Sequence, residues 1–569
     1  MRTIRVGNCS GFYGDRLSAM REMLEGGPLD YLTGDYLAEL TMLILGRDRL
    51  KNPELGYART FLRQLADCLQ LARSANVRIV TNAGGLNPAA LATAIRSLDA
   101  DVEVAYVCGD DLLHPESGRT WPGALTANAY LGAFGIAEAL RAGADIVVTG
   151  RVTDASLTLG PAIAEFGWTR DDLDELAAGI VAGHVLECGT QATGGNFSGF
   201  TTIDTSRPLG FPIAELSADG TVVITKHPVT GGAVTVDTVT AQLVYEIDTP
   251  HYLNPDVVTR LDTVQLTQKD QDQVEISGVR GSAPPATTKV GINRLGGHRN
   301  SVSFVLTGLD LDTKAAWVRR QLEAGLPKRP AEMTWDLVRT DRPDPATQRE
   351  ASALLCCHVK DPDPNLVGRA FSSAAVELAL ASYPGFHVTA PPAEASPFGV
   401  FEAAYLPQSE VPHLVVLPDG TRLHIPPPPT TAGSLEDVSG PATTVGTGWD
   451  PERATTPAPL GRLVYARSGD KGGAANVGVW IPAGHPRRRD AYDWLAGWLD
   501  ADRVRKLLPE AAELDVTVHA LPDLAALNIV IEGLLGAGVA ASTRFDPQAK
   551  AVGEWLRARN ADIPTELLR

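Results

Sequence analysis

The sequence predicts an α/β protein with a parallel α/β amino-terminal core, an α+β middle region and a small ferredoxin-like α+β domain at the carboxyl end. Three observations predict this organisation. Over residues 1–200, short apolar runs alternate with segments of helical periodicity, which is typical of parallel strands joined by helices. Over residues 201–410, strand patterns come first and helices follow, which favours an α+β continuation of the core. Residues 461–569 form a compact strand-and-helix segment that follows a Pro/Gly-rich linker at 411–460.

Each apolar run of the first block ends in a small, polar, glycine-rich loop that leads into a predicted helix. The predicted strands are Ile4–Val6, Tyr31–Leu32, Arg78–Val80, Val104–Val107 and Ile146–Val148, and the predicted helices are Tyr57–Ala75, Pro88–Leu98, Ala124–Ala142 and Ser156–Phe166. Ligands bind outside the carboxyl ends of parallel strands, so these loops predict one shared polar site of the kind found in enzymes. No GxGxxG follows the first strand and no P-loop motif occurs in this block, so nothing indicates a dinucleotide site.

The later blocks read mainly as strands. In the middle region, Ser217–Gly220 predicts a hairpin turn between Pro212–Glu215 and Thr221–Thr225. Further strands are predicted at Val234–Val239, Gln242–Ile247, Thr263–Thr267, Val274–Val279 and Ser301–Leu306, with helices at Thr313–Ala324 and Ser372–Ala381. In the last block, strands are predicted at Arg462–Ala466, Val477–Ile481, Val516–Ala520 and Asn528–Glu532, with helices at Asp490–Leu508 and Pro547–Arg559. Four strands with two helices favour a ferredoxin-like sandwich.

Composition limits the partners and the compartment. The net charge of −18 argues against a nucleic-acid partner, which requires a basic surface. No apolar run is long enough to span a membrane, and the amino terminus begins with a strand pattern instead of an apolar leader. Six cysteines without a CxxC pair fit a reducing compartment. We therefore expect a cytoplasmic protein with no membrane and no nucleic-acid partner.

The segment Thr149–Asp154 is the first candidate for chemistry, because it lies where a strand ends and a helix begins. Arg151 has the planar fork that holds a carboxylate or phosphate, and Asp154 can act as a base or orient another group. A structural interpretation is equally open. Asp154 or Thr153 would then only cap the helix, and Arg151 would pair with a nearby acid.

The second candidate is the group His184, Glu187 and Cys188, whose spacing places all three on one face of a helix. Such a group suits a metal site, a thiol paired with a histidine, or a polar wall in which Glu187 is the acid or base. A zinc site would need further ligands, and we predict no metal. A helix terminus with no chemistry also remains open.

The third candidate is the segment Ser468-Gly469-Asp470-Lys471, followed by Asn476. Backbone N–H groups of a glycine turn can form an anion-binding nest, and Lys471 adds a positive charge. The alternative is a plain hairpin connection. The combination of these polar residues predicts an anion-binding or interdomain loop, with the last domain docking on the core.

Several of these segments resemble one known family. The motifs are 7–16 (GNCSGFYGDR), 31–39 (YLTGDYLAE), 82–87 (NAGGLN), 149–154 (TGRVTD), 187–197 (ECGTQATGGNF) and 277–284 (SGVRGSAP), and they look like the acyclic terpene utilization protein AtuA family. The tail, with 467–472 (RSGDKG) and 476–478 (NVG), is similar to the ferredoxin-like domain that often follows the AtuA core. The resemblance implies breakdown of branched or terpenoid acids as coenzyme A thioesters.

Together, the residues and the resemblance predict an enzyme that acts on an acyl-CoA or a related branched carboxylic acid. A hydratase, dehydratase or other lyase step is favoured, because it needs an acid/base pair and an oxyanion stabiliser but no redox cofactor. The alternatives are a non-catalytic acyl-CoA-binding or scaffold protein and a metal-dependent hydrolase. No cofactor is expected apart from the coenzyme A of the substrate, and a homo-oligomer is expected because a neighbouring chain can complete a docking surface.

Residue roles follow from the same interpretation. Asp154 and Glu187 are the acid/base candidates, Arg151 would hold a carboxylate or thioester oxygen, and Cys188 and His184 complete the catalytic candidates. The predicted substrate-binding residues, mostly from the glycine-rich loops, are Asn8, Cys9, Ser10, Asp15, Arg16, Asp35, Asn82, Asn87, Asn128, Gln191 and Asn196.

Overall fold

The computed structural model describes residues 2–114, 117–433 and 453–568. The chain divides into two compact units, Met1–Asn293 with Phe401–Arg569, and Arg294–Val400. The region predicted as one α+β continuation at 201–410 is therefore divided between the two units. The long strand β14 (Thr287–Thr307) begins in the first unit and ends in the second. No helix among the described residues is long and apolar enough to cross a membrane.

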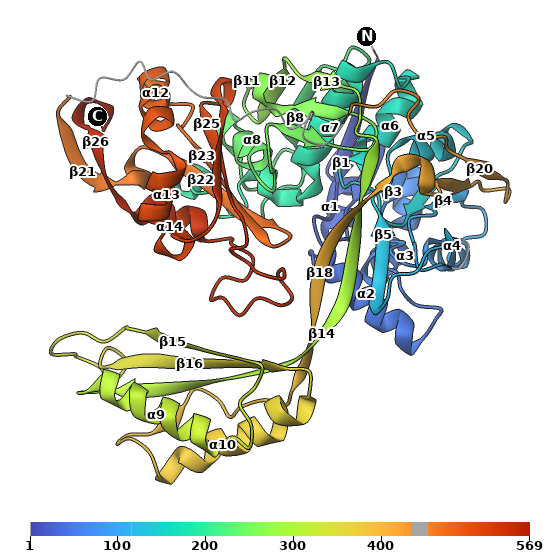
Figure 1. Ribbon diagram of the computed structural model, residues 1–569. Coiled ribbons are helices and arrows are strands. Elements are labelled where there is room, and N and C mark those ends of the chain that lie inside the picture. Colours follow the sequence, from blue (N-terminus) through green and yellow to red (C-terminus); the bar gives the residue numbers. More distant parts are fainter. Residues whose placement is uncertain (1, 115–116, 434–452, 569) are drawn as a thin grey trace. The chain divides into compact units, whose positions relative to one another are not determined.

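The first unit is built around a mixed sheet with five parallel strands at its centre (Figure 1). In spatial order these strands are β1 (Thr3–Asn8), β2 (Tyr31–Gly34), β3 (Arg78–Thr81), β6 (Ile146–Thr149) and β4 (Val104–Cys108). Antiparallel strands extend both edges: β7 (Pro212–Ser217), β8 (Val222–Lys226), β12 (Gln273–Ser277) and β11 (Gln265–Asp270) beyond β1, and β19 (Leu414–Val416) and β20 (Arg422–His424) beyond β4. The parallel core and the β7–β8 hairpin are as predicted.

Helices cover both faces of this sheet, because alternate residues of each strand point to opposite sides. Ile79 of β3 packs into one hydrophobic cluster and Val80 into another. The first cluster includes α1 (Ala19–Glu25), α3 (Arg59–Ser74) and α4 (Pro88–Arg96), and the second includes α5 (Phe134–Arg141), α6 (Ser156–Phe166) and α7 (Leu173–Glu187). A further helix, α2 (Glu39–Lys51), follows β2. The predicted helices of 57–75, 88–98 and 156–166 are therefore present.

The predicted helix Ala124–Ala142 was wrong in its first half. Residues Ala124–Ala129 form strand β5, which pairs with β14, and only Phe134–Arg141 is helical. The buried Asp256 carboxylate accepts a hydrogen bond from Ala133 N (2.6 Å) just before the helix begins. The small residues Ala127 and Ala129 suit a helix or a close-packed strand, and the long-range pairing with β14 decides between them.

Two predicted strands, Val234–Val239 and Gln242–Ile247, were also wrong. The segment instead forms helix α8 (Val236–Leu243). Thr235 caps this helix by accepting a hydrogen bond from Thr238 N (3.1 Å), and the Thr238 hydroxyl accepts one from Thr235 N in return. The β-branched residues favour a strand locally, but the reciprocal cap and the burial of Val239 and Leu243 favour a helix.

The predicted linker at 411–460 is partly ordered as sheet. Its first part contributes β19 and β20, which extend the central sheet at β4 because apolar residues such as Val415 are buried there. Residues 434–452 of the predicted linker lie outside the described residues. Beyond them, β21 (Thr455–Pro459) pairs with β26 (Asn560–Pro564) and belongs to the carboxy-terminal domain.

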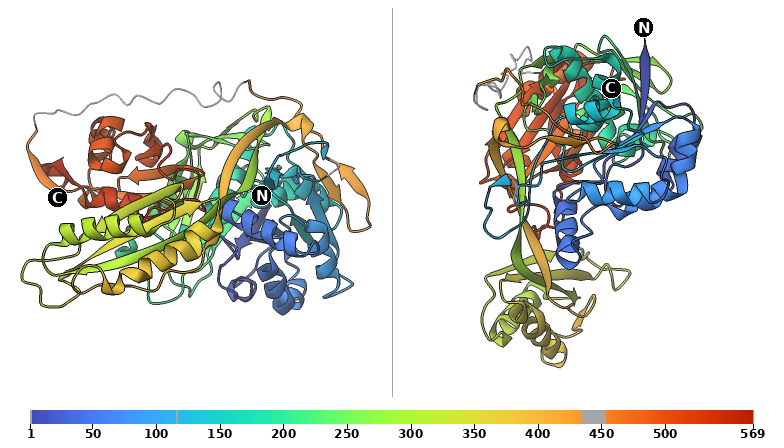
Figure 2. Two further views of the ribbon diagram at one scale, coloured as in Figure 1. Left: turned by 60° about the horizontal axis from the view of Figure 1, so that its bottom comes forward. Right: turned by 90° about the vertical axis from the view of Figure 1, so that its right-hand side faces the viewer.

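The second unit is a sheet with two helices on one face (Figure 2). Its strands run in the order β15 (Glu332–Val338), β16 (Ser352–Asp361), β14 and β17 (His387–Val388), with β18 (Ser396–Pro407) also pairing with β14. Helices α9 (Leu311–Gly325) and α10 (Phe371–Glu377) match the two helices predicted for this region, and their apolar residues share one hydrophobic cluster with the sheet.

The carboxy-terminal domain is a four-stranded antiparallel sheet with the order β22 (Tyr465–Lys471), β23 (Ala474–Trp480), β25 (Ala526–Ile531) and β24 (Val516–Leu521). Helices α12 (Arg488–Trp498), α13 (Ala501–Leu507) and α14 (Val552–Ala558) lie on the face away from α8 (Figure 1). The single helix predicted at Asp490–Leu508 is two helices, because Asp500 accepts a hydrogen bond from Arg503 N (2.7 Å) and starts a new one. The predicted ferredoxin-like arrangement is confirmed.

Candidate active site

The loops after the parallel strands meet, and polar side chains join them to one another. After β2 and β3, Asn82 Nδ2 donates to Asp35 Oδ1 (2.5 Å) and Asn82 Oδ1 accepts from Tyr36 N (2.8 Å). After β4, Asp110 Oδ2 accepts from Arg151 N and from Asn128 Nδ2 (both 2.8 Å). These side chains fix the backbone around the strand ends. The predicted substrate-binding residues Asn82 and Asn128 therefore already have protein partners.

The predicted binding residues of the first loop also hold local structure. Asn8 Nδ2 donates to Leu186 O, and Asn8 Oδ1 accepts from Ser10 N (3.1 Å). Asp15 accepts from Gly11 N (3.0 Å), and Arg16 pairs with Glu22 (2.6 Å). Of the remaining predicted residues, Cys9 is buried in a hydrophobic cluster, Ser10 Oγ donates to Phe12 O (3.0 Å), Asn87 caps α4, and Asn196 is exposed.

At the end of β6, Arg151 and Asp154 form a tight ion pair. Arg151 Nη1 donates to Asp154 Oδ1 (2.7 Å) and to Leu37 O (3.2 Å), and the guanidinium lies 4.3 Å from the centroid of the Tyr130 ring. Only 4% of the Arg151 side chain is exposed, against 28% of the Asp154 side chain. The structure thus leaves Asp154 within reach of a ligand, whereas the Arg151 fork that was predicted to clamp one is occupied.

His184 and Glu187 lie on the last turn of α7, as their spacing predicts, and His184 Nδ1 is 2.9 Å from Glu187 Oε1. Burial lowers the pKa of His184 to about 4, with the Lys471 charge adding to the effect. Burial raises the pKa of the Glu187 carboxyl well above its usual value, and the neighbouring Asp154 raises it further. His184 Nε2 and Glu187 Oε2 are buried without a hydrogen-bond partner among the described residues. The pair therefore favours a neutral imidazole beside a protonated carboxyl group.

Two other carboxyl groups at this site have raised pKa values. Burial and the neighbouring Asp154 raise the pKa of Asp35, while Arg151 opposes the shift. Burial and Glu39 raise the pKa of Asp154 in the same way, again opposed by Arg151. Several carboxyl groups that compete for few cations behave as a coupled set, in which the charge of each group raises the pKa of its neighbours.

Cys188 follows α7 directly and is partly buried. Burial raises the pKa of this thiol well above its usual value, with the charges of Glu246 and Glu187 adding to the shift. The thiol form therefore dominates at neutral pH, which does not favour a nucleophilic thiolate. No group of three or more His, Cys, Asp or Glu side chains in the described part of the chain is arranged to hold a metal ion. Gln191, in the following turn, has a buried Oε1 without a hydrogen-bond partner there.

A second set of charged groups lines the site and was not predicted from the sequence. Lys289 Nζ, on β14, is 3.5 Å from Glu39 Oε1 and lies near the Tyr130 and Phe401 rings (5.0 and 5.3 Å to the centroids). About a quarter to a third of the Lys289 and Glu39 side chains is exposed. Burial opposes the ionised form of Glu39, but Lys289 and Arg151 outweigh it and hold the pKa at about 2. A lone lysine in a strand pattern carries no sequence signal, because only the β5–β14 pairing brings it here.

The carboxy-terminal domain forms another wall of the site. The predicted loop Ser468–Gly473 is instead mostly strand β22, and Gly472-Gly473 makes the turn to β23. The backbone of 468–471 is used in strand pairing, so the predicted anion-binding nest is not formed. Alternation along β22 sends Arg467 and Lys471 towards the core, where they donate to Asn196 O (3.0 Å) and Glu246 O (2.8 Å).

The other residues of that predicted loop bind their own domain or join it to the core. Ser468 Oγ accepts from Gly553 N of α14 (2.9 Å), and Asp470 Oδ1 is 3.5 Å from Lys550 Nζ. Asn476 Oδ1 accepts from Glu246 N of the core (2.7 Å). The segment thus lies where the last domain meets the core.

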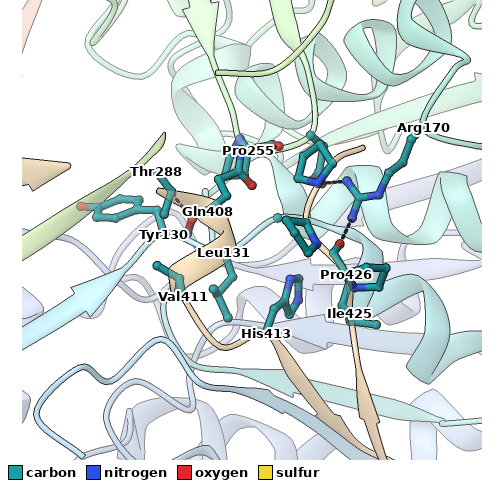
Figure 3. Close-up of a pocket in the computed structure, with 14 residues that line it drawn as sticks. Tyr130, Leu131, Arg170, Pro255, Thr288, Gln408, Val411, His413, Ile425 and Pro426 are labelled. Atoms are coloured by element: carbon teal, nitrogen blue, oxygen red, sulfur yellow. Dashed lines mark hydrogen bonds and ion pairs between the residues drawn. The ribbon is translucent and has the colours of Figure 1, made fainter. Parts of the chain in front are cut away.

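A separate small cavity lies behind Tyr130, lined by Arg170, Gln408, His413 and Pro426 among others (Figure 3). Arg170 Nη2 donates to Pro426 O (2.9 Å), and Arg170 Nη1 lies 3.5 Å from Asp256 Oδ1. The volume of about 30 Å³ holds one or two water molecules and no metabolite. We assign the residues that line this cavity a structural role: their contacts hold the 408–428 segment against the edge of the sheet beside the site.

Comparison with protein families agrees with the motifs and the fold. The model of the acyclic terpene utilisation family protein AtuA matches residues 4–417, and the model of the AtuA ferredoxin-like domain matches residues 458–562. No curated protein and no solved structure matches the chain. The first match covers the strands whose loops build the site, and the second covers the strand that brings Arg467 and Lys471 to it. The chain belongs to the AtuA family of acyclic terpene utilisation and carries the AtuA ferredoxin-like domain at its carboxyl end.

Proposed function

We propose that this protein is an enzyme that acts on an acyl-CoA or a related branched carboxylic acid by proton transfer, in a hydration, dehydration or other lyase step. The observation that carries the proposal is the presence at one site of two acid/base candidates, Asp154 and Glu187, with different surroundings. Asp154 is held by Arg151 (2.7 Å), whereas Glu187 faces neutral His184 (2.9 Å). Environments that separate the proton affinities of two carboxyl groups are typical of a general acid and a general base.

Each residue of the site has a distinct role in the proposed reaction. In a hydration, the anionic form of Asp154, paired with Arg151, takes a proton from water as the water oxygen attacks the β-carbon of an unsaturated thioester. Glu187 donates its proton to the α-carbon, and His184 Nδ1, 2.9 Å from Glu187 Oε1, holds the carboxyl group in place. Asp154 then loses the proton it took from water to solvent and Glu187 takes one up, which completes the cycle. The ammonium group of a lysine at the site, Lys289 or Lys471, stabilises the negative charge that develops on the thioester oxygen. Dehydration runs through the same groups in reverse.

The family membership supports the substrate class. Acyclic terpenes are branched hydrocarbon chains, and their acids present a carboxyl or thioester group next to an apolar tail. We propose that coenzyme A enters only as part of such a substrate and that no separate cofactor takes part.

The test is turnover of a panel of saturated, unsaturated, hydroxylated and branched CoA thioesters by the full chain, with gain or loss of water followed by mass spectrometry. Glu187→Gln and Asp154→Asn should each lower the rate about 100-fold, because each removes one proton-transfer group. The matched control is Glu25→Gln at the exposed end of α1, which should keep the wild-type rate.

Two results would contradict the proposal. Full activity in both site variants would remove the acid/base assignment. Binding of thioesters by calorimetry without any product would indicate a non-catalytic acyl-CoA-binding or scaffold protein of the same pathway instead.

A further inference from the structure

We propose that the carboxy-terminal domain supplies an anion subsite to the active site, in which Lys471 of β22 binds a free carboxylate of the ligand, with Arg467, four residues earlier on the same face of the strand, as a second cation without an anion. This inference rests on the proposed function for the location of the site and goes further, because it names a charged group that the substrate carries in addition to its reacting carbonyl. It also gives the last domain a direct role in recognition.

The geometry of β22 is the first support. Residues 467, 469 and 471 share one face of the strand, and that face is turned towards the core. The residue between the two cations is glycine, and a Cβ there would overlap the Tyr245 ring. The strand can therefore lie against Tyr245, with the Arg467 guanidinium over the Tyr245 ring and the Lys471 ammonium near the Tyr252 ring.

The second support is that Lys471 and Arg467 have no carboxylate partner among the described residues. Every other cation of the site has a carboxylate partner: Arg151 has Asp154 (2.7 Å), Lys289 has Glu39 (3.5 Å) and Lys550 has Glu246 (3.4 Å). Lys471 Nζ contacts only a backbone oxygen, Glu246 O (2.8 Å), and the Tyr252 ring (5.9 Å), and no ion pair joins it to any described residue. Lys471 is only partly buried, in contrast to Arg467.

Arg467, like Lys471, contacts backbone oxygens and an aromatic ring. Its Nη1 donates to two backbone oxygens, Gly195 O (3.1 Å) and Asn196 O (3.0 Å), and the guanidinium lies 4.4 Å from the centroid of the Tyr245 ring. Nε and Nη2 have no hydrogen-bond partner in the described part of the chain, and the residue is only 4% exposed. A buried guanidinium without an anion is costly, and a bound carboxylate would offset that cost.

The charge balance of the site is the third support. Its cations are Arg151, Lys289, Arg467, Lys471 and Lys550, and its carboxyl groups are Asp35, Glu39, Asp154, Glu187, Glu246 and Asp470. Burial raises the pKa of Asp470 to about 7, and those of Asp35, Asp154 and Glu187 are raised as well. Each carboxyl group that holds a proton leaves one cation uncompensated, so the site favours an anionic ligand.

The charge of Lys471 also locates the subsite. Its ammonium lies 5.9 Å from the centroid of the Tyr252 ring, and the His184 ring lies 4.9 Å from the same ring, so Tyr252 separates Lys471 from the acid/base pair; the Lys471 charge also lowers the pKa of His184 and opposes the upward shift of the Glu187 pKa. A group bound there is therefore one aromatic ring away from the acid/base pair. A carboxylate of the acyl part suits this place better than a phosphate of the nucleotide arm, which lies a pantetheine length away from the thioester.

The experiment measures binding to the full chain by calorimetry at low ionic strength, with glutarate as the carboxylate probe, glutaramide as its neutral counterpart, and inorganic phosphate and adenosine 3′,5′-bisphosphate as nucleotide-arm probes. The wild type should bind glutarate and not glutaramide. Lys471→Met should weaken glutarate binding about 10- to 100-fold, because it removes a charge-assisted hydrogen bond. Lys471→Arg keeps the charge and should retain most of the binding.

Lys506→Met is the matched control, because it removes one exposed lysine from α13 of the same domain. It should bind glutarate as the wild type does. Thermal unfolding of each variant shows whether it is folded, and Lys471→Gln, which also removes the charge, provides the test should Lys471→Met unfold.

Three outcomes would overturn the inference: no glutarate binding to the wild type, equal binding to Lys471→Met, or Lys471-dependent binding of the phosphate probes in place of glutarate. A failure of the proposed function would give a different result from a failure of the anion subsite. If Lys471-dependent glutarate binding is found but no thioester is turned over, the subsite stands and the lyase activity does not.

Discussion

Asp110 shows how a single buried side chain sets the strand-end geometry. Its carboxylate receives Arg151 N and Asn128 Nδ2, and its side chain fills the space beside Gly150, where a Cβ would overlap it. Burial outweighs these hydrogen bonds and raises the pKa of Asp110 from 3.8 to about 7. The residue therefore stabilises the loops around the site, but its charged form is disfavoured in the folded protein.

This shift gives a pH-dependent stability. Between about pH 4 and pH 7 the folded chain holds a proton on Asp110 that the unfolded chain has lost, so the contribution of Asp110 to stability falls as the pH rises through that window. Asp110→Asn removes the ionisation. The Tm of the variant minus the Tm of the wild type should increase from pH 4 to pH 7 and then level off. The exposed Asp101→Asn should show no such trend, and a difference that is constant with pH would contradict the assignment.

At the scale of elements, close approach between β23 and α8 fastens the last domain to the core. Gly478 of β23 lies against Val244, and a Cβ at this position would overlap Val244 Cγ2. Beside it, Trp480 Nε1 donates to Asp237 Oδ1 of α8 (3.1 Å), and Asn528 Nδ2 of β25 donates to Ile247 O (3.1 Å). Steric fit and hydrogen bonds thus act at the same contact.

Gly478→Ala tests this contact. The added methyl group forces Val244 or the sheet to move, and overpacking of this kind costs about 1–3 kcal/mol. We expect a lower Tm and faster proteolysis. Gly484→Ala, in the same domain, meets no atom within 4 Å and should behave as the wild type. Equal stability of the two variants would show that β23 does not pack closely against Val244.

At the scale of the whole molecule, the carboxy-terminal domain has a hydrophobic core of its own. Its strands and helices share a cluster that includes Val477, Trp494, Leu527 and Leu556. Its outer sheet face, with Trp480, joins the main cluster of the core instead. The domain therefore has both an independent interior and an apolar surface fitted to the rest of the chain.

We predict that residues 453–569 fold as an isolated fragment, because their interior needs no residue of the core. Circular dichroism and amide dispersion in NMR spectra would show this. An unfolded fragment would contradict the prediction and show that docking is required for folding. The homo-oligomer stays a prediction that concerns the full chain, in which a neighbouring copy would add to this surface.

The sequence by itself determined the features that depend on neighbouring residues. Helical periodicity places α3 and α6, the alternation of apolar runs and glycine-rich loops places β1 to β4 and β6, and the three-residue spacing brings His184 to Glu187. The carboxyl ends of parallel strands meet at one edge, so the presence of a polar site could be predicted from the same pattern.

Only the tertiary structure decided which side chains face that site. The pairing of β5 with β14 turns a predicted helix into a strand and brings Lys289 beside Glu39, although the two are far apart in the sequence. The docking of β22 turns Lys471 inward, while Arg151, Asn82 and Asn128 are taken up by protein partners. Local patterns place many of the strands and helices along the chain. Long-range pairing and burial fix which polar groups are satisfied within the chain and which are left for a ligand.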